Sequence, residues 1–331
     1  MNGETLDWDA LDRLRGGFLG GAVAAGPYWR SRGDLAAYDT TYGERIGWKW
    51  DAVLRELRLR GWTPPAGAAV LDWGCGSGVA GRRVVAFFGA EGFSALQLHD
   101  HSPAALEFAG EAARAAFPRL AVGSWRDDGK SPGLLVISHV LNELPPASRA
   151  ALLALARRAA AVLWVEPGTH ADGRALQELR EELRGEFSVV APCTHETSCG
   201  LLAAGRERDW CHHFAPPPPE IFTDGGWVKF GRRAGIDLRS VPYSFLALDR
   251  RTRTAAPADL SRIIGRPEHF KVFARFLNCD AGGVAELTLQ KRDDPALFKQ
   301  LDRTPGPLLY RWRRDGDRVS GGEPLGAEPR T

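Results

Sequence analysis

Three of the chain's five cysteines and three of its eight histidines lie within the 24 residues from Ala191 to Phe214. Thiolates and imidazoles are the side chains that bind zinc, and thiolates also hold iron–sulfur clusters. A cysteine beside a histidine can instead act as a nucleophile with its base. The segment therefore predicts a metal site or a covalent catalyst, against the simpler alternative of buried cysteines that bind nothing.

The spacing of these cysteines favours a site that is assembled from several loops. Five residues separate Cys193 from Cys199 and eleven separate Cys199 from Cys211, whereas zinc knuckles use pairs with roughly two to four residues between them. A fourth ligand must come from the distant Cys279 or from a nearby histidine. Four thiolates suit zinc and an iron–sulfur cluster alike, so spacing leaves the metal open.

A second candidate site is the glycine-rich turn at residues 70–78, VLDWGCGSG. Its alternating glycines are Gly74, Gly76 and Gly78. Glycine permits the tight turn and the close backbone approach to a ligand that nucleotide-binding folds need after their first strand. Asp72 stands two residues before these glycines, where a carboxylate suits the ammonium group of S-adenosylmethionine and not a pyrophosphate. S-adenosylmethionine is thus favoured, although Gly76, Gly78 and Gly81 also satisfy the dinucleotide pattern.

Polar residues at the ends of later strands extend this site. Asp100 ends the second predicted strand, where a carboxylate can accept hydrogen bonds from the ribose of either cofactor. The fourth predicted strand ends at Ser138, in SHVLNELPP. Beside it, His139 and Glu143 could act as a general base and acid, or His139 could be a polar residue that is satisfied at a strand end. No complete catalytic set stands out.

Strands and helices are predicted to alternate behind these residues. The strands are expected at 70–72, 95–98, 120–122, 134–138 and 161–165, and the helices up to about 89 and over 102–117, 146–160 and 173–184. This alternation predicts a doubly wound, Rossmann-like α/β sheet. The glycine turn stands where such a sheet has its first strand-to-helix turn.

The chain on either side of this region has other patterns. Residues before about 62 look helical, because DAVLRELRLRGW repeats apolar residues at helical spacing. After Val190 the alternation fails, and four prolines at 216–219 precede short β-like runs in WVKFGRRAG, VPYSFLALDRR, HFKVFARFLNC and GGVAELTLQKR. The predicted regions are a helical segment 1–62, a cofactor-binding core 63–190, a cysteine segment 191–225, a β-rich basic unit 226–314 and a disordered tail 315–331.

The stretch from the glycine turn to the fifth strand resembles the class I S-adenosylmethionine-dependent methyltransferases, through the turn and Asp100. The resemblance implies that Asp72 and the three glycines bind the methionine and ribose part of the cofactor and that Asp100 binds the ribose. Trp125 or Arg126, after the third strand, would lie near the adenine, and Ser138 completes the set. In these enzymes alignment of donor and nucleophile dominates methyl transfer.

Pro192-Cys193 is similar to the Pro-Cys pair with which cytosine-C5 RNA methyltransferases attack a base. In that class the pair follows the fourth strand of the sheet, whereas here it follows the fifth predicted strand and its helix. The catalytic cysteine is therefore kept as a minor alternative.

Three signatures in order, PCTHETSC, DWCHHF and RIIGRP leading to Cys279, resemble the methyltransferase-like assembly factors of the mitochondrial small ribosomal subunit and their bacterial relatives. The resemblance runs from about residue 70 to 291. It implies a [4Fe–4S] cluster and engagement of small-subunit rRNA during ribosome maturation. The implied cluster ligands are Cys193, Cys199, Cys211 and Cys279. Gly200 departs from the proline expected after the second cysteine.

Charge is distributed unevenly along the chain. Residues 226–331 hold 20 Lys and Arg against 13 Asp and Glu, although the whole chain carries only +2. Arginines beside Tyr310 and Trp312 could contact irregular or single-stranded RNA, and an arginine-rich solvated surface is the alternative. No apolar run reaches the roughly 20 residues of a membrane span, and the N-terminus is acidic, so a cytoplasmic protein without disulfides is expected.

Together these patterns predict a methyltransferase-like protein that binds S-adenosylmethionine and a [4Fe–4S] cluster and acts on small-subunit rRNA or its assembly particle. Whether it transfers a methyl group is left open. The alternatives are a non-catalytic assembly factor with a vestigial pocket and a small-molecule methyltransferase that is stapled by zinc.

Overall fold

The structure is a computed structural model, and it forms two compact units. The described residues are 6–20, 29–251, 257–303 and 306–326. The first unit comprises Met1–Arg55, Thr63–Val165 and Ala215–Val241, and the second comprises Glu56–Trp62, Glu166–Phe214 and Pro242–Thr331. Each unit thus combines segments that the sequence assigned to different regions.

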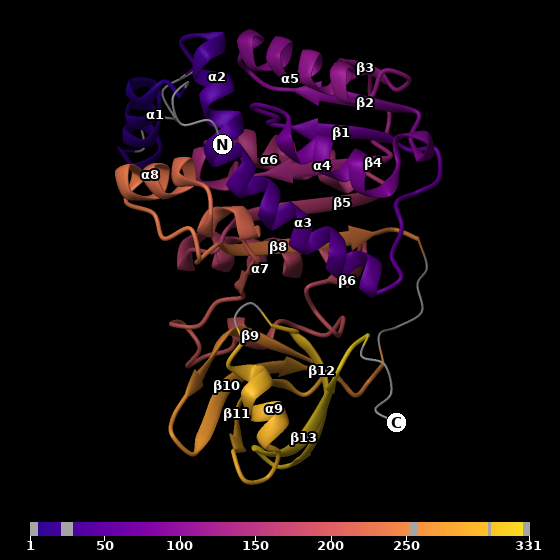
Figure 1. Cartoon of the computed structure of the whole chain (residues 1–331). Coiled ribbons are helices and arrows are strands. Elements are labelled where there is room, and N and C mark those ends of the chain that lie inside the picture. The colour runs from indigo at the N-terminus through magenta and orange to yellow at the C-terminus, as the bar shows by residue number, and fades with distance from the viewer. Residues whose placement is uncertain (1–5, 21–28, 252–256, 304–305, 327–331) are drawn as a thin grey trace. The chain divides into compact units, whose positions relative to one another are not determined.

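The first unit contains the predicted parallel sheet (Figure 1). Its strands are β1 (Ala69–Trp73), β2 (Ala95–His99), β3 (Ala121–Ser124), β4 (Leu134–Ser138) and β5 (Ala161–Pro167). They pair in the order β3-β2-β1-β4-β5, and every pair from β3 to β5 is parallel. The central strands are mostly apolar and have both faces buried, as expected when helices cover a parallel sheet.

Helices connect these strands close to their predicted positions. They are α4 (Val79–Phe88), α5 (Pro103–Ala116) and α6 (Pro146–Arg158), with short 3-10 turns η3 (Ala90–Gly92) and η4 (Leu141–Glu143). The Ser102 hydroxyl caps α5 by accepting from the Ala105 amide, with a proline in the first turn. The doubly wound α/β class is therefore confirmed.

The N-terminal region is helical, as predicted. Its elements are α1 (Trp8–Gly20), α2 (Arg32–Tyr38), the π-helical η2 (Asp39–Gly43) and α3 (Glu44–Leu59). Residues 21–28 lie outside the described part of the chain.

The run WVKFGRRAG was predicted to be β-like, and this is wrong. It lies in α8 (Gly225–Ala234), which follows η6 (Pro219–Phe222). Asp224 caps the helix by accepting from the Gly226 amide, and Gly235 ends it in the left-handed conformation at φ 61°. Trp227, Phe230 and Ala234 are buried at helical spacing, so the period is three to four and not two.

The second unit joins an antiparallel ladder to a barrel. Its first part comprises α7 (His170–Leu183), β6 (Ser188–Ala191), η5 (Gly200–Leu202), β7 (His213–Phe214) and β8 (Pro242–Asp249). The strand β8 pairs antiparallel with β6 and with β7. Helix α7 begins three residues before its predicted start, because the Thr169 hydroxyl accepts from the Asp172 amide as its cap. Between β6 and β7 the cysteine segment is mostly irregular.

The C-terminal part closes into a five-stranded barrel, which Figure 1 shows in orange and yellow. Its elements are β9 (Leu260–His269), β10 (Phe273–Asp280), β11 (Gly283–Gln290), α9 (Pro295–Leu301), β12 (Leu309–Asp315) and β13 (Arg318–Pro324). The closed order is β10-β11-β13-β12-β9, with a parallel β11–β13 pair. Counted from β9 this is the 1-2-3-5-4 order of an OB-fold, with its helix between the third and fourth strands.

The barrel confirms the predicted β-rich unit and corrects the predicted tail. Residues 315–331 were expected to be disordered, but β13 lies within them and Val319 is fully buried in the barrel core. The composition of this tail hid a strand because several of its glycines lie in turns or against the paired strand β12. In the described part of the chain, no helix is long and apolar enough to cross a membrane.

Candidate functional site

The glycine turn links β1 to α4 in the first unit. Gly74, Gly76 and Gly78 adopt φ values of 71°, 51° and 79°, a left-handed region that side chains other than glycine rarely adopt. A Cβ atom at Gly74 would lie 2.7 Å from Val140 Cγ1, and one at Gly78 would lie 2.8 Å from Ala109 Cβ. At Gly76 the nearest atom would be 3.9 Å away, so this position borders open space. The three glycines are needed for the conformation, and Gly76 leaves room for a ligand.

Asp72 is fully buried beneath this turn. Its Oδ2 accepts from the Gly81 amide at 2.9 Å, while Oδ1 is buried with no hydrogen-bond partner within the described residues. Burial raises the pKa of Asp72 to about 7. A buried acceptor without a partner is a costly feature that a bound cationic donor would satisfy. The chemical groups of the glycine turn and of Asp72 therefore suit the methionine end of S-adenosylmethionine.

Asp100 holds the turn through its carboxylate. One oxygen accepts from the Gly76 amide and the other from the Ser102 amide, each at 2.9 Å. The side chain thus bridges the loops after β1 and β2, where the sequence placed it. Its predicted contact with ribose stays a prediction, because both oxygens are already engaged with backbone donors.

Trp125 follows β3 and lies beside the same strand ends. Its amide donates to the Leu98 carbonyl at 2.8 Å, and its ring meets His99 edge to face with centroids 5.4 Å apart. The structure therefore brings Trp125 next to β2, as an adenine-contacting residue requires. Nothing in the structure assigns a role to Arg126.

Ser138 and His139 form a buried polar chain at the end of β4. The Ser138 Oγ accepts from Trp50 Nε1 at 3.0 Å and lies 3.1 Å from His139 Nδ1, and Lys49 Nζ lies 2.7 Å from His139 Nε2. Burial, and then the charges of Lys49 and Arg45, hold the pKa of His139 well below its ordinary value. Both ring nitrogens have partners, which favours a satisfied polar residue over a free general base.

His139 also adopts a φ of 57°, which is unusual for a residue other than glycine. Glu143, four residues further on, has its pKa raised to about 7 by burial and then by the charge of Asp100. A carboxyl group of this kind can exchange a proton near neutral pH. Glu143 is thus the better candidate for proton transfer of the two.

The four predicted ligand cysteines meet in the second unit. A cavity of about 40 Å³ is lined by Cys193, Cys199, Cys211 and Cys279. Three of the sulfur-bearing residues pack with Leu201 and Ile264, so the surroundings are apolar on one side. Cys279 reaches the cysteine segment from β10, as the sequence predicted.

Two arginines also line this cavity, Arg180 of α7 and Arg262 of β9. Burial raises the pKa of Cys193, and the nearby Arg180 guanidinium opposes this by stabilising the thiolate. Burial likewise holds the pKa of Cys211 well above its ordinary value, with Arg262 acting in the opposite direction. The thiols are therefore protonated when they have no ligand, and the arginines are positioned to offset negative charge when thiolates form.

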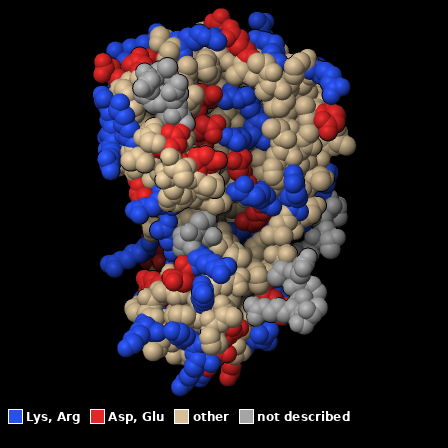
Figure 2. Space-filling model, viewed as in Figure 1, with Lys and Arg blue, Asp and Glu red and all other residues tan. Residues whose placement is uncertain are grey.

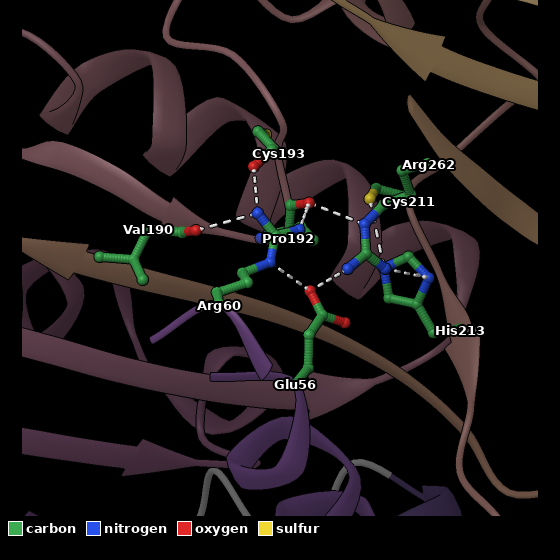
Figure 3. Close-up of polar contacts among 8 residues, drawn as sticks. All are labelled: Glu56, Arg60, Val190, Pro192, Cys193, Cys211, His213 and Arg262. Carbon is green, nitrogen blue, oxygen red and sulfur yellow. Dashed lines mark hydrogen bonds and ion pairs between the residues drawn. The ribbon is translucent and has the colours of Figure 1, made fainter. Parts of the chain in front are cut away.

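A buried ion-pair triad fixes one wall of the cavity (Figure 3). Glu56, at the end of α3, accepts from Arg60 Nε at 2.9 Å and from Arg262 Nη2. Arg60 also donates to the Val190, Pro192 and Cys193 carbonyls at 2.7 to 3.2 Å, and Arg262 Nε donates to Pro192 at 2.7 Å. All three side chains are at most 10% exposed. The chain leading into Cys193 is thus held by fixed donors.

Helix α7 fixes another part of the cavity wall. The Gln177 Oε1 accepts from the Cys211 amide at 3.2 Å, and the Glu181 carboxylate accepts from the Cys199 amide at 3.0 Å. Arg180 Nη2 donates to the His195 carbonyl at 3.1 Å. The helix therefore positions the backbone of two cysteines from one face.

Sequence reasoning missed these supporting residues. Glu56 and Arg60 form an i, i+4 pair on a helix that the sequence did predict, and this spacing was the available signal. Arg262 lies in the RIIGRP signature, but nothing in the sequence showed that it is buried. Gln177 and Arg180 carried no signal beyond their place on the predicted helix.

In the described chain, no three His, Cys, Asp or Glu side chains are arranged as ligands of a single metal ion. The four thiols instead surround a cavity that also holds arginine cations and N–H donors. This donor set is of the kind that iron–sulfur and zinc sites use, so the residues fit such a group in chemistry.

The sequence predicted that arginines beside Tyr310 and Trp312 contact RNA, with an arginine-rich solvated surface as the alternative. The arginines are exposed, but the Tyr310 ring is not. Tyr310 is fully buried in the barrel core, and Trp312 stacks on it with ring centroids 4.3 Å apart. The neighbouring Arg311 and Arg313 are exposed, because alternate residues of a strand face the same side, and Arg314 is exposed where the β12–β13 register shifts. Figure 2 shows Lys and Arg side chains spread over the visible face, over the barrel as well as over the first unit. Part of the run DRRTRT, residues 252–254, lies outside the described chain.

Comparison with solved structures finds low similarity to methyltransferases. An S-adenosylmethionine-dependent methyltransferase from Aquifex aeolicus is 14% identical over 49% of this chain and 90% of its own, with a TM-score of 0.36. Magnesium protoporphyrin IX methyltransferase from Synechocystis PCC 6803 is 17% identical over 56% and 88%, with a TM-score of 0.34. YjhP from E. coli is 15% identical over 61% and 92%, with a TM-score of 0.36.

No curated protein matches the chain. A protein-family model does: residues 51–301 match the family described as mitochondrial small ribosomal subunit Rsm22. The matched region includes the glycine turn, all four cysteines of the cavity and most of the barrel.

Proposed function

Because this chain belongs to the Rsm22 family, we propose that it is a methyltransferase-like protein acting on small-subunit rRNA or on the particle in which that RNA is assembled. The family description names a mitochondrial ribosomal subunit, and the location of this chain, expected to be cytoplasmic, stays a prediction. The proposal has three parts, which concern the cofactor, the cluster and the RNA.

The cofactor part is that the first unit binds S-adenosylmethionine. The observation that carries it is the buried Asp72 Oδ1, which has no partner among the described residues and lies beneath three left-handed glycines. The bound cofactor would supply an electrophilic methyl group. Asp72 would bind its ammonium group, and the turn, with Asp100, Trp125 and Ser138 after the neighbouring strands, would hold the rest.

Titration calorimetry with S-adenosylmethionine tests this part. The wild-type chain should bind it, and Asp72→Ala should weaken binding at least tenfold, since it removes a buried ionic contact. An exposed substitution in the same unit, Asp127→Ala, is the control and should bind normally. Absence of binding by the wild-type chain would sink the cofactor proposal.

A non-catalytic assembly factor is the second candidate function. The specific observation in its favour is that both ring nitrogens of His139 are already occupied by Lys49 and Ser138. Cofactor binding without methylation of ribosomal RNA in matched extracts, measured with a radiolabelled methyl donor, would select this candidate.

The cluster part is that Cys193, Cys199, Cys211 and Cys279 bind a [4Fe–4S] cluster. Support comes from the four thiols around one cavity and from two arginine cations that would offset the charge of the thiolates. The cluster would mainly tie β10 to the cysteine segment and so contribute folding free energy.

Anaerobic purification followed by iron, sulfide and zinc analysis tests the cluster. We expect brown protein that absorbs near ~400 nm, with iron and sulfide in equal amounts. Cys279→Ser should lose the absorbance. Colourless protein with one zinc per chain would show that the four cysteines bind zinc and not the cluster. The cofactor proposal would be unaffected.

The RNA part rests on the barrel. OB-fold barrels bind single strands across their second and third strands and the loops beside them. In this barrel the hairpin between β9 and β10 exposes Phe270 and Val272 with Lys271 between them. An exposed aromatic ring and a lysine are the groups that stack on bases and pair with phosphate. Crosslinking of the chain to ribosomal particles in cells should recover small-subunit rRNA, and its failure to do so would overturn this part.

A further inference from the structure

Each of the four cysteine thiols has a nitrogen-bearing side chain beside it. We infer that these four residues set the reduction potential of the bound cluster by donating hydrogen bonds to its cysteine sulfurs. They are Arg180, Gln177, His213 and His195. The inference rests on the proposed cluster and adds to it the residues that would control its redox behaviour.

The contacts come from three places in the second unit, namely α7, β7 and the cysteine segment. Gln177 Nε2 donates to Cys199 Sγ at 3.5 Å. His213 Nε2 lies 3.7 Å from Cys211 Sγ, and His195 Nε2 lies 3.6 Å from Cys279 Sγ. All three distances are within the range of hydrogen bonds to sulfur, whose atom is larger than oxygen. Arg180 lines the cavity together with Cys193.

The neighbours of Gln177 fix which end of its amide faces the sulfur. Its oxygen accepts from the Cys211 amide, and a backbone N–H can only donate. The NH₂ end must therefore be the one that faces Cys199. One side chain thus holds the backbone of one cysteine and donates to the sulfur of another.

The two histidines are oriented by fixed partners as well. Arg262 Nη1 lies 3.2 Å from His213 Nδ1 and 3.3 Å from Nε2, and a guanidinium only donates. A cluster-bound thiolate can only accept a hydrogen bond, so the nitrogen that faces Cys211 would carry the N–H, and Nδ1 would accept from Arg262. At His195, the Thr197 hydroxyl lies 2.7 Å from Nδ1 and can donate to it, which leaves the Nε2 hydrogen for Cys279.

Hydrogen bonds to cysteine sulfur withdraw electron density from the cluster. They stabilise the reduced state, which carries more negative charge, more than the oxidised state. Loss of one donor should therefore lower the reduction potential. Because each donor faces a different cysteine sulfur, the effects of single substitutions should be separable.

Spectroelectrochemical titration of the anaerobically reconstituted full-length chain tests this inference. His195→Leu should lower the midpoint potential, and His195→Gln, which restores an N–H donor, should recover most of the loss. Gln177→Glu keeps the acceptor for the Cys211 amide but replaces the donor to Cys199, so it should lower the potential too. Iron and sulfide contents should stay equal to those of the wild-type chain.

A matched control is His212→Leu. This histidine lies in the same segment, stacks on Trp210 and places Nδ1 3.0 Å from the Trp210 carbonyl, away from the four thiols. Its loss should leave the potential unchanged. Resonance Raman spectra give a second readout, since loss of an N–H···S bond shifts the iron–cysteine stretching bands, even in a variant with partial cluster content.

The outcomes separate the inference from the proposal beneath it. If the wild-type chain takes up no iron and sulfide, the proposed cluster is wrong. If it takes up the cluster but His195→Leu and Gln177→Glu match His212→Leu in potential and in Raman bands, the inferred tuning role is wrong and the cluster proposal stands.

Discussion

Asp72 couples cofactor binding to pH at the scale of a single residue. Its pKa is raised to about 7 by burial, so the folded chain holds this proton between pH ~4 and ~7 while the unfolded chain releases it. Stability is therefore lost as the pH rises through this window. The three-unit difference corresponds to a cost on the order of 4 kcal/mol above pH ~7.

Asp72→Asn should remove this dependence, because an amide cannot ionise and its oxygen can still accept from Gly81. Denaturant unfolding at pH ~5 and ~8 should show the variant gaining more stability at the higher pH than at the lower. The affinity of the wild-type chain for S-adenosylmethionine should instead rise with pH, since the ammonium group binds the ionised carboxylate. A wild-type affinity that is the same at both pH values would contradict the assigned contact.

Glu56 holds together two buried arginines, and its loss should be costly. Arg60 and Arg262 hold the pKa of Glu56 below its ordinary value despite burial. The stability that Glu56 contributes is therefore present above its pKa in the unfolded chain. It is lost as the pH falls through the lower pKa of Glu56 in the folded chain. Glu56→Gln should destabilise the chain by about 3–5 kcal/mol at neutral pH, because it leaves both cations without an anion. Glu91→Gln, an exposed carboxylate, is the matched control in thermal unfolding. Equal melting temperatures for the two variants would contradict the triad's role.

At the scale of elements, α8 shows where local patterns mislead. Its sequence is rich in glycine, arginine and aromatic residues, so a strand was expected, but caps at both ends decide for a helix. Gly235→Ala should cost about 1 kcal/mol in denaturant unfolding, since its φ is 61° and a Cβ would lie 3.1 Å from Arg15 Nη2. Gly225→Ala, in the first turn with open space around it, should cost little. Similar losses for both would show that the cap is not what ends the helix.

The helices and strands also show how much of the fold could be predicted from the sequence. The parallel strands and their helices were predicted within a few residues, because buried runs such as β4 and β5 are locally apolar and flanked by clear turn residues. Closure of the barrel was not predictable, since the β11–β13 pairing joins strands that are separated by α9 and β12. The four cysteines around the cavity were picked out by a signature, whereas the side chains that hold their backbone, such as Gln177, become visible only when the fold brings distant segments together.

At the scale of the whole molecule, the uneven charge gives a test of RNA binding by the intact chain. Binding of single strands releases counterions, so each lysine or arginine on the phosphate path contributes about 0.7 to the slope of log affinity against log salt. Lys271, in the exposed β9–β10 hairpin of the barrel, is the residue we expect on that path. Lys271→Gln should reduce the slope by about this amount.

The exposed Lys299 of α9 provides the control, because OB-fold barrels contact single strands through their second and third strands and adjoining loops, not through this helix. Filter binding of a ribosomal RNA fragment at a series of salt concentrations measures both variants. Lys299→Gln should keep the wild-type slope, since its charge lies off the expected path. An unchanged slope for Lys271→Gln, or an equal change for both lysines, would place the RNA elsewhere on the molecule and leave the barrel without this role.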